Sequence, residues 1–172
     1  MKSRAVRLLS VVAAISFWSV AATLARAEES DSAALAAAMK SATATLQGGL
    51  RVSEAQGTPI SAKFEIENGK LQLSIYTMKG SDFMEVVADP KTGAIAKAEK
   101  ITDADDLKEG ASQKAAIAKA KAPLLTAIET AVNANAGSRA VSIVPELKNG
   151  QATAEVTLLT GNVLKKVTEK LD

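Results

Sequence analysis

The chain has 172 residues, with 21 Lys and Arg, 19 Asp and Glu, and neither His nor Cys. The absence of both residue types excludes Ser-His-Asp triads, Cys-His dyads and the common zinc and haem-attachment sites. We therefore expect no catalytic residues, no cofactor and no metal centre, and an enzyme built on this chain would have to rely on carboxylates.

The first 27 residues have the three parts of a secretory signal peptide. Lys2, Arg4 and Arg7 give a basic start, residues 8–20 form an apolar run, and Ala25-Arg26-Ala27 places small residues before a cleavage site. A membrane-spanning helix needs about 20 apolar residues, more than this run provides. The sequence predicts cleavage after Ala27, no stable membrane insertion afterwards, and a periplasmic or secreted protein of the bacterial envelope.

Cleavage changes the charge of the protein. Removing residues 1–27 takes away four basic residues and no acidic one, which leaves 17 basic residues against 19 acidic ones and a net charge of −2. A nucleic-acid partner needs a basic surface. We therefore expect no nucleic-acid binding.

The mature chain begins with a polar stretch, residues 28–32, that predicts a flexible lead-in. An Ala-rich segment follows, and its larger apolar residues recur at helical spacing. We expect a helix that begins near Ser32 and stops at Gly48-Gly49. Its buried face would hold Leu35, Met39, Ala42 and Leu46.

After Pro59 the apolar residues alternate with polar ones, which is typical of strands with one buried face. Strands are expected over residues 60–66, 71–78, 83–88 and 94–98, with a tight hairpin at Asn68-Gly69. In the second strand the alternation predicts that Leu73 is buried and Ser74 is exposed.

The second half repeats this order after a polar linker over residues 102–111. A helix is expected over 112–133, kinked or restarted at Pro123, followed by strands around Asn149-Gly150. The hairpins of the two halves align at a spacing of 81 residues. The sequence thus predicts an α+β fold of two repeats, residues 33–101 and 112–172, each with a helix packed on a small antiparallel sheet.

A small-residue helix, a hairpin and a third strand that closes on Asp89-Pro90-Lys91-Thr92-Gly93 resemble the PepSY domain. The resemblance covers about residues 33–100. It is weaker in the second half, which ends at Lys170-Leu171-Asp172, where the closing turn would begin. The resemblance implies a helix on an antiparallel sheet outside the cytoplasm, and a non-enzymatic role in binding or regulating another envelope protein, with peptidases among the candidates.

Two acidic features permit a second interpretation. Asp103, Asp105, Asp106 and Glu109 could supply oxygen ligands to Ca²⁺, which would make the chain an envelope metal-binding protein. The spacing does not fit an EF-hand, and the same residues are suited to capping a helix. Asp89 and Thr92 are interpreted as turn residues, with Gly93 supplying a positive φ.

The strand after Asn68-Gly69 carries the main candidate for partner binding. With Leu71, Leu73 and Ile75 turned toward the helix, Tyr76 and Met78 fall on the opposite face. Aromatic residues and Met are enriched in protein interfaces. Tyr76 and Met78 are therefore predicted to contact a partner, unless a flanking segment covers them. The corresponding positions in the second half are Thr153, Glu155, Thr157 and Leu159.

Overall fold

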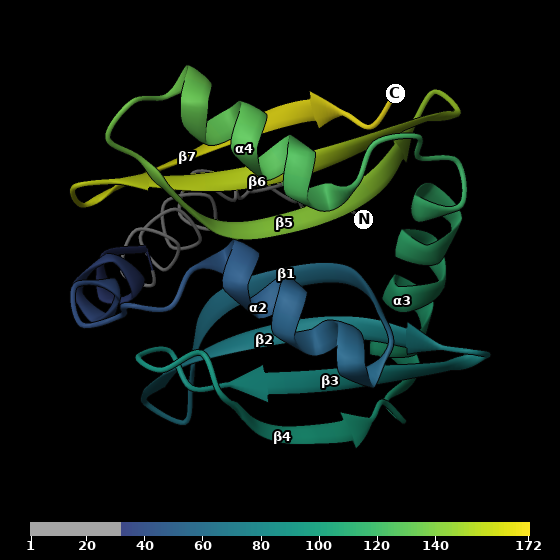
Figure 1. The fold of residues 1–172 in the computed structure, drawn as a ribbon, viewed down its shortest axis with the longest axis horizontal. Coiled ribbons are helices and arrows are strands. Elements are labelled where there is room, and N and C mark those ends of the chain that lie inside the picture. Colours follow the sequence, from purple (N-terminus) through teal and green to yellow (C-terminus); the bar gives the residue numbers. More distant parts are fainter. Residues whose placement is uncertain (1–31) are drawn as a thin grey trace, which may run out of the picture.

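A computed structural model describes residues 32–172. The fold is α+β, as predicted, and is built on one antiparallel sheet of seven strands in the order β4-β3-β2-β1-β5-β6-β7 (Figure 1). The strands are β1 (Thr58–Glu67), β2 (Lys70–Lys79), β3 (Asp82–Ala88), β4 (Ile95–Lys100), β5 (Arg139–Lys148), β6 (Gln151–Thr160) and β7 (Val163–Lys170). The expected signal peptide, residues 1–27, and all but the last residue of the lead-in lie outside the described residues.

Two tight hairpins set the register of the sheet. Asn68 and Gly69 join β1 to β2 with φ angles of 49° and 73°, and Asn149 and Gly150 join β5 to β6 with 52° and 80°. Two successive residues with positive φ are what a two-residue turn of the primed type requires, and Asn-Gly meets that requirement at the least strain. Both hairpins occur where the sequence predicts them.

The two halves of the chain meet at the centre of the sheet through β1 and β5. Their pairing is short, because only Ala62 opposite Ile143 and Lys63 opposite Ser142 are in register. The hydrophobic core nevertheless runs through both halves, from Leu73 and Ile75 to Val156. The halves therefore share one sheet and one core.

Helices cover one face of this sheet. A helical segment over residues 32–39, α2 (Leu46–Ser53) and α4 (Leu124–Ala134) pack there, and a short 3-10 turn, η1 (Glu54–Gln56), follows α2. Figure 1 shows α2 and α4 side by side in front of the sheet. Their completely buried side chains include Leu46 and Ile128, which lie in the same core as Leu73, Ile75 and Ile143.

The remaining helix, α3 (Ala104–Ile117), lies on the other face and crosses one end of the strands (Figure 1). The predictions of a linker over 102–111 and a helix over 112–133 are wrong in their boundaries. Asp103 accepts hydrogen bonds from the backbone N–H groups of Asp105 and Asp106, so the helix begins inside the expected linker. Pro123 directly precedes the first residue of α4, so a new helix starts after this proline. This is one of the two outcomes, kink or restart, that the sequence predicts.

The prediction that Gly48-Gly49 stops the first helix is also wrong. The helix breaks earlier, over residues 40–45, and both glycines lie inside α2, which Thr45 caps. A Cβ on Gly49 would lie 2.7 Å from Cδ2 of Leu73. Gly49 therefore allows α2 to approach the sheet closely, and it does not end a helix.

The alternation along β2 holds for Leu73 but not for Ser74. Both residues have no exposed surface. On the α3 face, the side chain of Gln72 reaches over Ser74 and donates a hydrogen bond of 3.0 Å to its hydroxyl oxygen. Long neighbouring side chains thus cover a small polar residue on a face that no helix covers there, and the expected exposure of Ser74 is wrong.

The segment between the first helical residues and α2 is fixed by two polar contacts. Arg139 donates hydrogen bonds to the carbonyl oxygens of Met39, Ala42 and Ala44 at 3.3, 2.9 and 2.8 Å. The same segment also contacts the turn after β3, because the N–H groups of Thr43 and Ala44 both donate hydrogen bonds to the carbonyl oxygen of Pro90. Residues 39–44 are therefore attached to both halves of the sheet.

The turn after β3 is organised by Asp89, as predicted. Its Oδ1 accepts hydrogen bonds from the N–H groups of Lys91 and Thr92 and from the Thr92 hydroxyl, and Gly93 has a φ of 74°. These hydrogen bonds, the backbone ones first, hold the pKa of Asp89 below its usual value.

Candidate functional site

A groove lies on the α3 face, directly over the junction of the two halves. Its walls come from β1, β2, α3 and β5, and its volume is about 350 Å³. We call it the seam groove. The side chains that line it include Ser61, Lys63, Tyr76, Glu109, Ser112, Gln113, Val144, Pro145 and Glu146.

The seam groove arises because α3 leaves much of this face uncovered. The helix crosses at the ends of the strands, where Gly110 brings it close to Phe83: a Cβ on Gly110 would lie 3.0 Å from the ring. Ile117, further along, packs on the buried cluster of Ile60, Phe83 and Ile101. These contacts fix α3 beside the β1–β5 junction and form one wall of the groove.

Lys63 and Glu65 form an ion pair of 2.7 Å beside the groove, and the Lys63 ammonium lies 5.6 Å from the centre of the Tyr76 ring. Partial burial alone would lower the pKa of Lys63, but the hydrogen bond and charge of Glu65 raise it above its usual value. For Glu65, burial acts to raise the pKa, and Lys63 with the neighbouring hydroxyl and amide groups lowers it overall. Both groups are therefore charged at neutral pH.

Gln113 brings an amide to the wall of the groove. The residue as a whole is 9% exposed, and its Oε1 accepts a hydrogen bond of 2.7 Å from the hydroxyl of Ser61. The amide nitrogen has no hydrogen-bond partner among residues 32–172. Because this nitrogen is not among the buried polar atoms of residues 32–172 that lack a partner, it is open to solvent and free to donate a hydrogen bond to a ligand in the groove.

The two residues predicted to bind a partner lie on one face of β2, as expected, and both are half-buried. Both pack on the cluster of Ile60, Phe83 and Ile101 at the crossing of α3. Tyr76 also lines the seam groove, whereas Met78 does not. In the second half, Thr153, Thr157 and Leu159 are buried and Glu155 forms an ion pair of 2.8 Å with Lys166.

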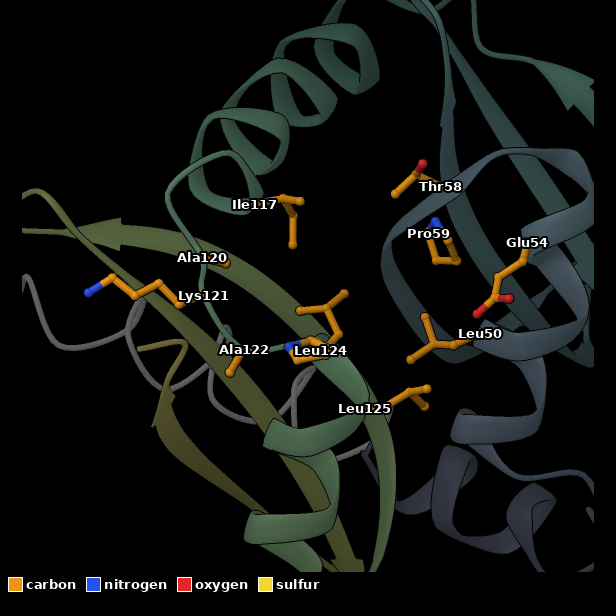
Figure 2. A pocket seen from close by; sticks show the side chains of 11 residues that line it. Leu50, Glu54, Thr58, Pro59, Ile117, Ala120, Lys121, Ala122, Leu124 and Leu125 are labelled. Carbon is orange, nitrogen blue, oxygen red and sulfur yellow. The ribbon is translucent and has the colours of Figure 1, made fainter.

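A second hollow, of about 330 Å³, lies where α2, the start of β1 and the connection from α3 to α4 converge. Figure 2 shows Leu50 and Pro59 on one side of it and Ile117, Leu124 and Leu125 on the other. Its lining is mainly aliphatic. It has few polar groups that could orient a ligand, so the seam groove is the better candidate for specific recognition.

The acidic residues near the start of α3 do not form a metal site. Asp103 is occupied as the N-terminal cap, and Asp105 lies with Asp106 in the first turn, where negative charge is favourable. Among residues 32–172 no group of three or more acidic residues is arranged to hold a metal ion. The calcium interpretation gains no support from this geometry.

Two residues of structural importance were not singled out by the sequence patterns. Arg139 is the first residue of β5, and Gln113 lies in α3, inside the helix predicted over 112–133. A polar residue at a position where the helical period requires an apolar one could have drawn attention to Gln113. No comparable signal exists for Arg139, because its partners are backbone carbonyls about 100 residues away.

Comparisons with known proteins show little similarity to this chain. No protein-family model matches the chain, and no curated protein matches it. Among solved structures, it is similar to a protein of Clostridium difficile 630 that is provisionally described as a lipoprotein. The similarity covers 71% of this chain and 80% of that protein, with 14% sequence identity and a TM-score of 0.39. Within residues 32–172, no helix has the length and apolar character needed to cross a membrane.

Proposed function

We propose that this chain is a non-enzymatic protein of the bacterial envelope, periplasmic or secreted, that binds another protein through the seam groove. Peptidases are among the candidate partners. The observation that carries the proposal is the groove itself, in which the half-buried ring of Tyr76 and the exposed side chain of Val144 lie beside the free amide of Gln113. Aromatic anchors surrounded by a few polar groups are characteristic of protein-binding surfaces.

The ion pair in the groove supports a binding role over catalysis. A general acid or base works best with a pKa near the operating pH. The pKa of Lys63 is raised and that of Glu65 is lowered, so the surroundings move both away from neutrality. Such a pair suits the positioning of Tyr76 and its neighbours better than proton transfer.

The proposal includes two PepSY-like units in tandem. In support, the bounds of β5 and β6 each lie 81 residues after those of β1 and β2. Both β1 and β5 also carry a register shift at corresponding places, between Pro59 and Ser61 and between Ala140 and Ser142. In this proposal the groove lies between two related units and offers a surface that neither unit has alone.

The binding role can be tested with a matched pair of variants on β5. Val144 and Leu147 are each 38% exposed, but only Val144 lines the seam groove. The protein would be used to capture partners from a periplasmic extract, and affinity for the captured protein would be measured for Val144→Arg and Leu147→Arg. We expect Val144→Arg to lose at least about tenfold in affinity, as for a residue in the centre of an interface, and Leu147→Arg to bind like the unmodified protein.

Equal affinities for the two variants, with unchanged melting temperatures, would show that the partner binds elsewhere. The location of the protein is tested separately by the intact mass of the secreted form. We expect a mass that begins at Glu28, in the soluble fraction, whereas a membrane-bound form that retains Met1 to Ala27 would contradict the proposed compartment.

A further inference from the structure

The α3 wall of the seam groove presents two polar groups that have no partner. Glu109 and Gln113 are four residues apart on α3, so they lie on the same side of the helix, and both line the groove. Glu109 is exposed and makes no ion pair within the part of the chain that the structure describes. The amide nitrogen of Gln113, which is open to solvent, likewise has no hydrogen-bond partner there. This wall therefore offers one negative charge and one hydrogen-bond donor.

The other charges of the groove are already neutralised. Lys63 is paired with Glu65 at 2.7 Å, and the Oε1 of Glu146 lies 2.6 Å from the ammonium of Lys148, which balances its charge although the contact is not aligned as a hydrogen bond. Glu109 is thus the one unpaired charge among the lining residues of 32–172. Burial raises the pKa of Tyr76; Lys63 opposes this, and the negative charges of Glu85, Glu65 and Asp106 add to it.

The remaining walls suit the stem of a long side chain. Val144 and Pro145 supply aliphatic surface, and the Tyr76 ring supplies an aromatic one. A carboxylate ligand would be repelled by Glu109, and a purely aliphatic side chain would leave Glu109 and Gln113 without a new partner. A cation on an aliphatic stem satisfies each wall, because its methylene groups pack on apolar surface while its charge reaches a carboxylate.

We propose that the seam groove receives a basic side chain, arginine or lysine, from the bound partner protein. The cation pairs with the carboxylate of Glu109, and the free amide nitrogen of Gln113 donates a hydrogen bond to a main-chain carbonyl oxygen of the same partner segment. This inference rests on the proposed function and specifies the chemistry of the segment that the groove recognises.

The test uses three blocked tripeptides, Ala-Arg-Ala, Ala-Leu-Ala and Ala-Glu-Ala, titrated into the isotopically labelled protein and followed by amide chemical shifts. We expect Ala-Arg-Ala to shift the signals of Tyr76, Glu109 and Gln113, and to bind at least about tenfold more tightly than the other two, as for one charge-assisted contact. Glu109→Gln should weaken this binding about fivefold or more, and added salt should do the same.

Glu54→Gln is the matched control, because Glu54 is also exposed but lines the aliphatic hollow of Figure 2. It should leave the affinity for Ala-Arg-Ala unchanged. The inference is overturned if Ala-Leu-Ala binds as well as Ala-Arg-Ala, if Glu109→Gln has no effect, or if no peptide shifts the groove signals at tens of millimolar.

Failure of this inference can be told apart from failure of the proposed function. If Val144→Arg abolishes capture of the partner while Glu109→Gln does not weaken peptide binding, the groove binds a protein but does not select a basic residue. If Val144→Arg leaves capture intact, the proposed function itself is wrong, whatever the peptides show.

Discussion

Arg139 offers the sharpest test of how the fold is held together. Its guanidinium donates hydrogen bonds to the carbonyl oxygens of Met39, Ala42 and Ala44 and lies 5.7 Å from the centre of the Phe64 ring. Replacing Arg139 with Met keeps an apolar stem of similar length and removes the whole donor group. The residues that lose their partner belong to the segment before α2, so the variant should loosen that segment from the second half of the sheet.

The cost can be estimated from the contacts. A hydrogen bond from a charged donor contributes about 1.5–3 kcal/mol, and a cation–π contact on a partly exposed ring about 0.5–1 kcal/mol. The three hydrogen bonds share one guanidinium, which is only half-buried, and water can replace some of them. We therefore expect Arg139→Met to lower the free energy of unfolding by about 3 kcal/mol, less than the sum of the separate contacts.

Urea unfolding measures this loss, and a shift of the midpoint by about 1–2 M would correspond to it. Arg139→Lys keeps the charge but cannot form the planar fork, so it should fall between Met and Arg. The control is Arg51→Met, because Arg51 forms a loose, exposed ion pair of 4.0 Å with Glu129 and should contribute less than about 1 kcal/mol. If Arg139→Met is no more destabilising than Arg51→Met, Arg139 does not connect the two halves as described.

The other two predictions concern a buried serine and a turn aspartate. Ser74→Asp would bury a carboxylate near Glu65, so it should lower the free energy of unfolding by at least about 2 kcal/mol; a melting temperature equal to that of the unmodified protein would contradict the burial. Asp89→Asn removes a carboxylate whose pKa is lower in the folded than in the unfolded chain. Such a group stabilises the fold above its unfolded pKa of about 4 and loses this effect as the pH falls through its folded pKa. Asp89→Asn should therefore melt at a lower temperature at pH 7, with the difference shrinking below about pH 4; a constant difference across this range would contradict the role of the charge.

Much of the sheet could be predicted from local patterns. The Asn-Gly turns, the burial of Leu73 and Ile75, and the Asp89 turn each depend on residues close in the chain, and all three are present, although Ser74 between the two apolar residues is buried as well. The helices were less predictable. Gly49 and Gly110 look like helix breakers in the sequence, but each allows a helix to lie close to a large side chain, Leu73 or Phe83, that is distant in the chain.

The candidate site could also be predicted only in part. Alternation places Tyr76 on the face opposite Leu73, and the structure places it there in the groove. The partners of Tyr76 could not be predicted, because Val144 reaches the groove only through the pairing of β1 with β5. Gln113 reaches it through α3, a helix of which residues 104–111 were predicted as linker. The composition of the site therefore depends on pairing between segments that are distant in the chain. Local sequence periodicity does not predict such pairing.

The short pairing of β1 with β5 also bears on the order in which the chain folds. Each hairpin closes a loop of two residues, whereas joining Ala62 to Ile143 closes one of 80, and the entropy lost in loop closure rises with length. The hairpins therefore have reason to form first and the central pair late. Until then β1 is a sheet edge whose backbone N–H and C=O groups are open to pairing with another strand. At high protein concentration during refolding, β1 of one chain can therefore pair with β5 of another chain. This strand exchange between two chains competes with the native pairing of β1 with β5 inside one chain.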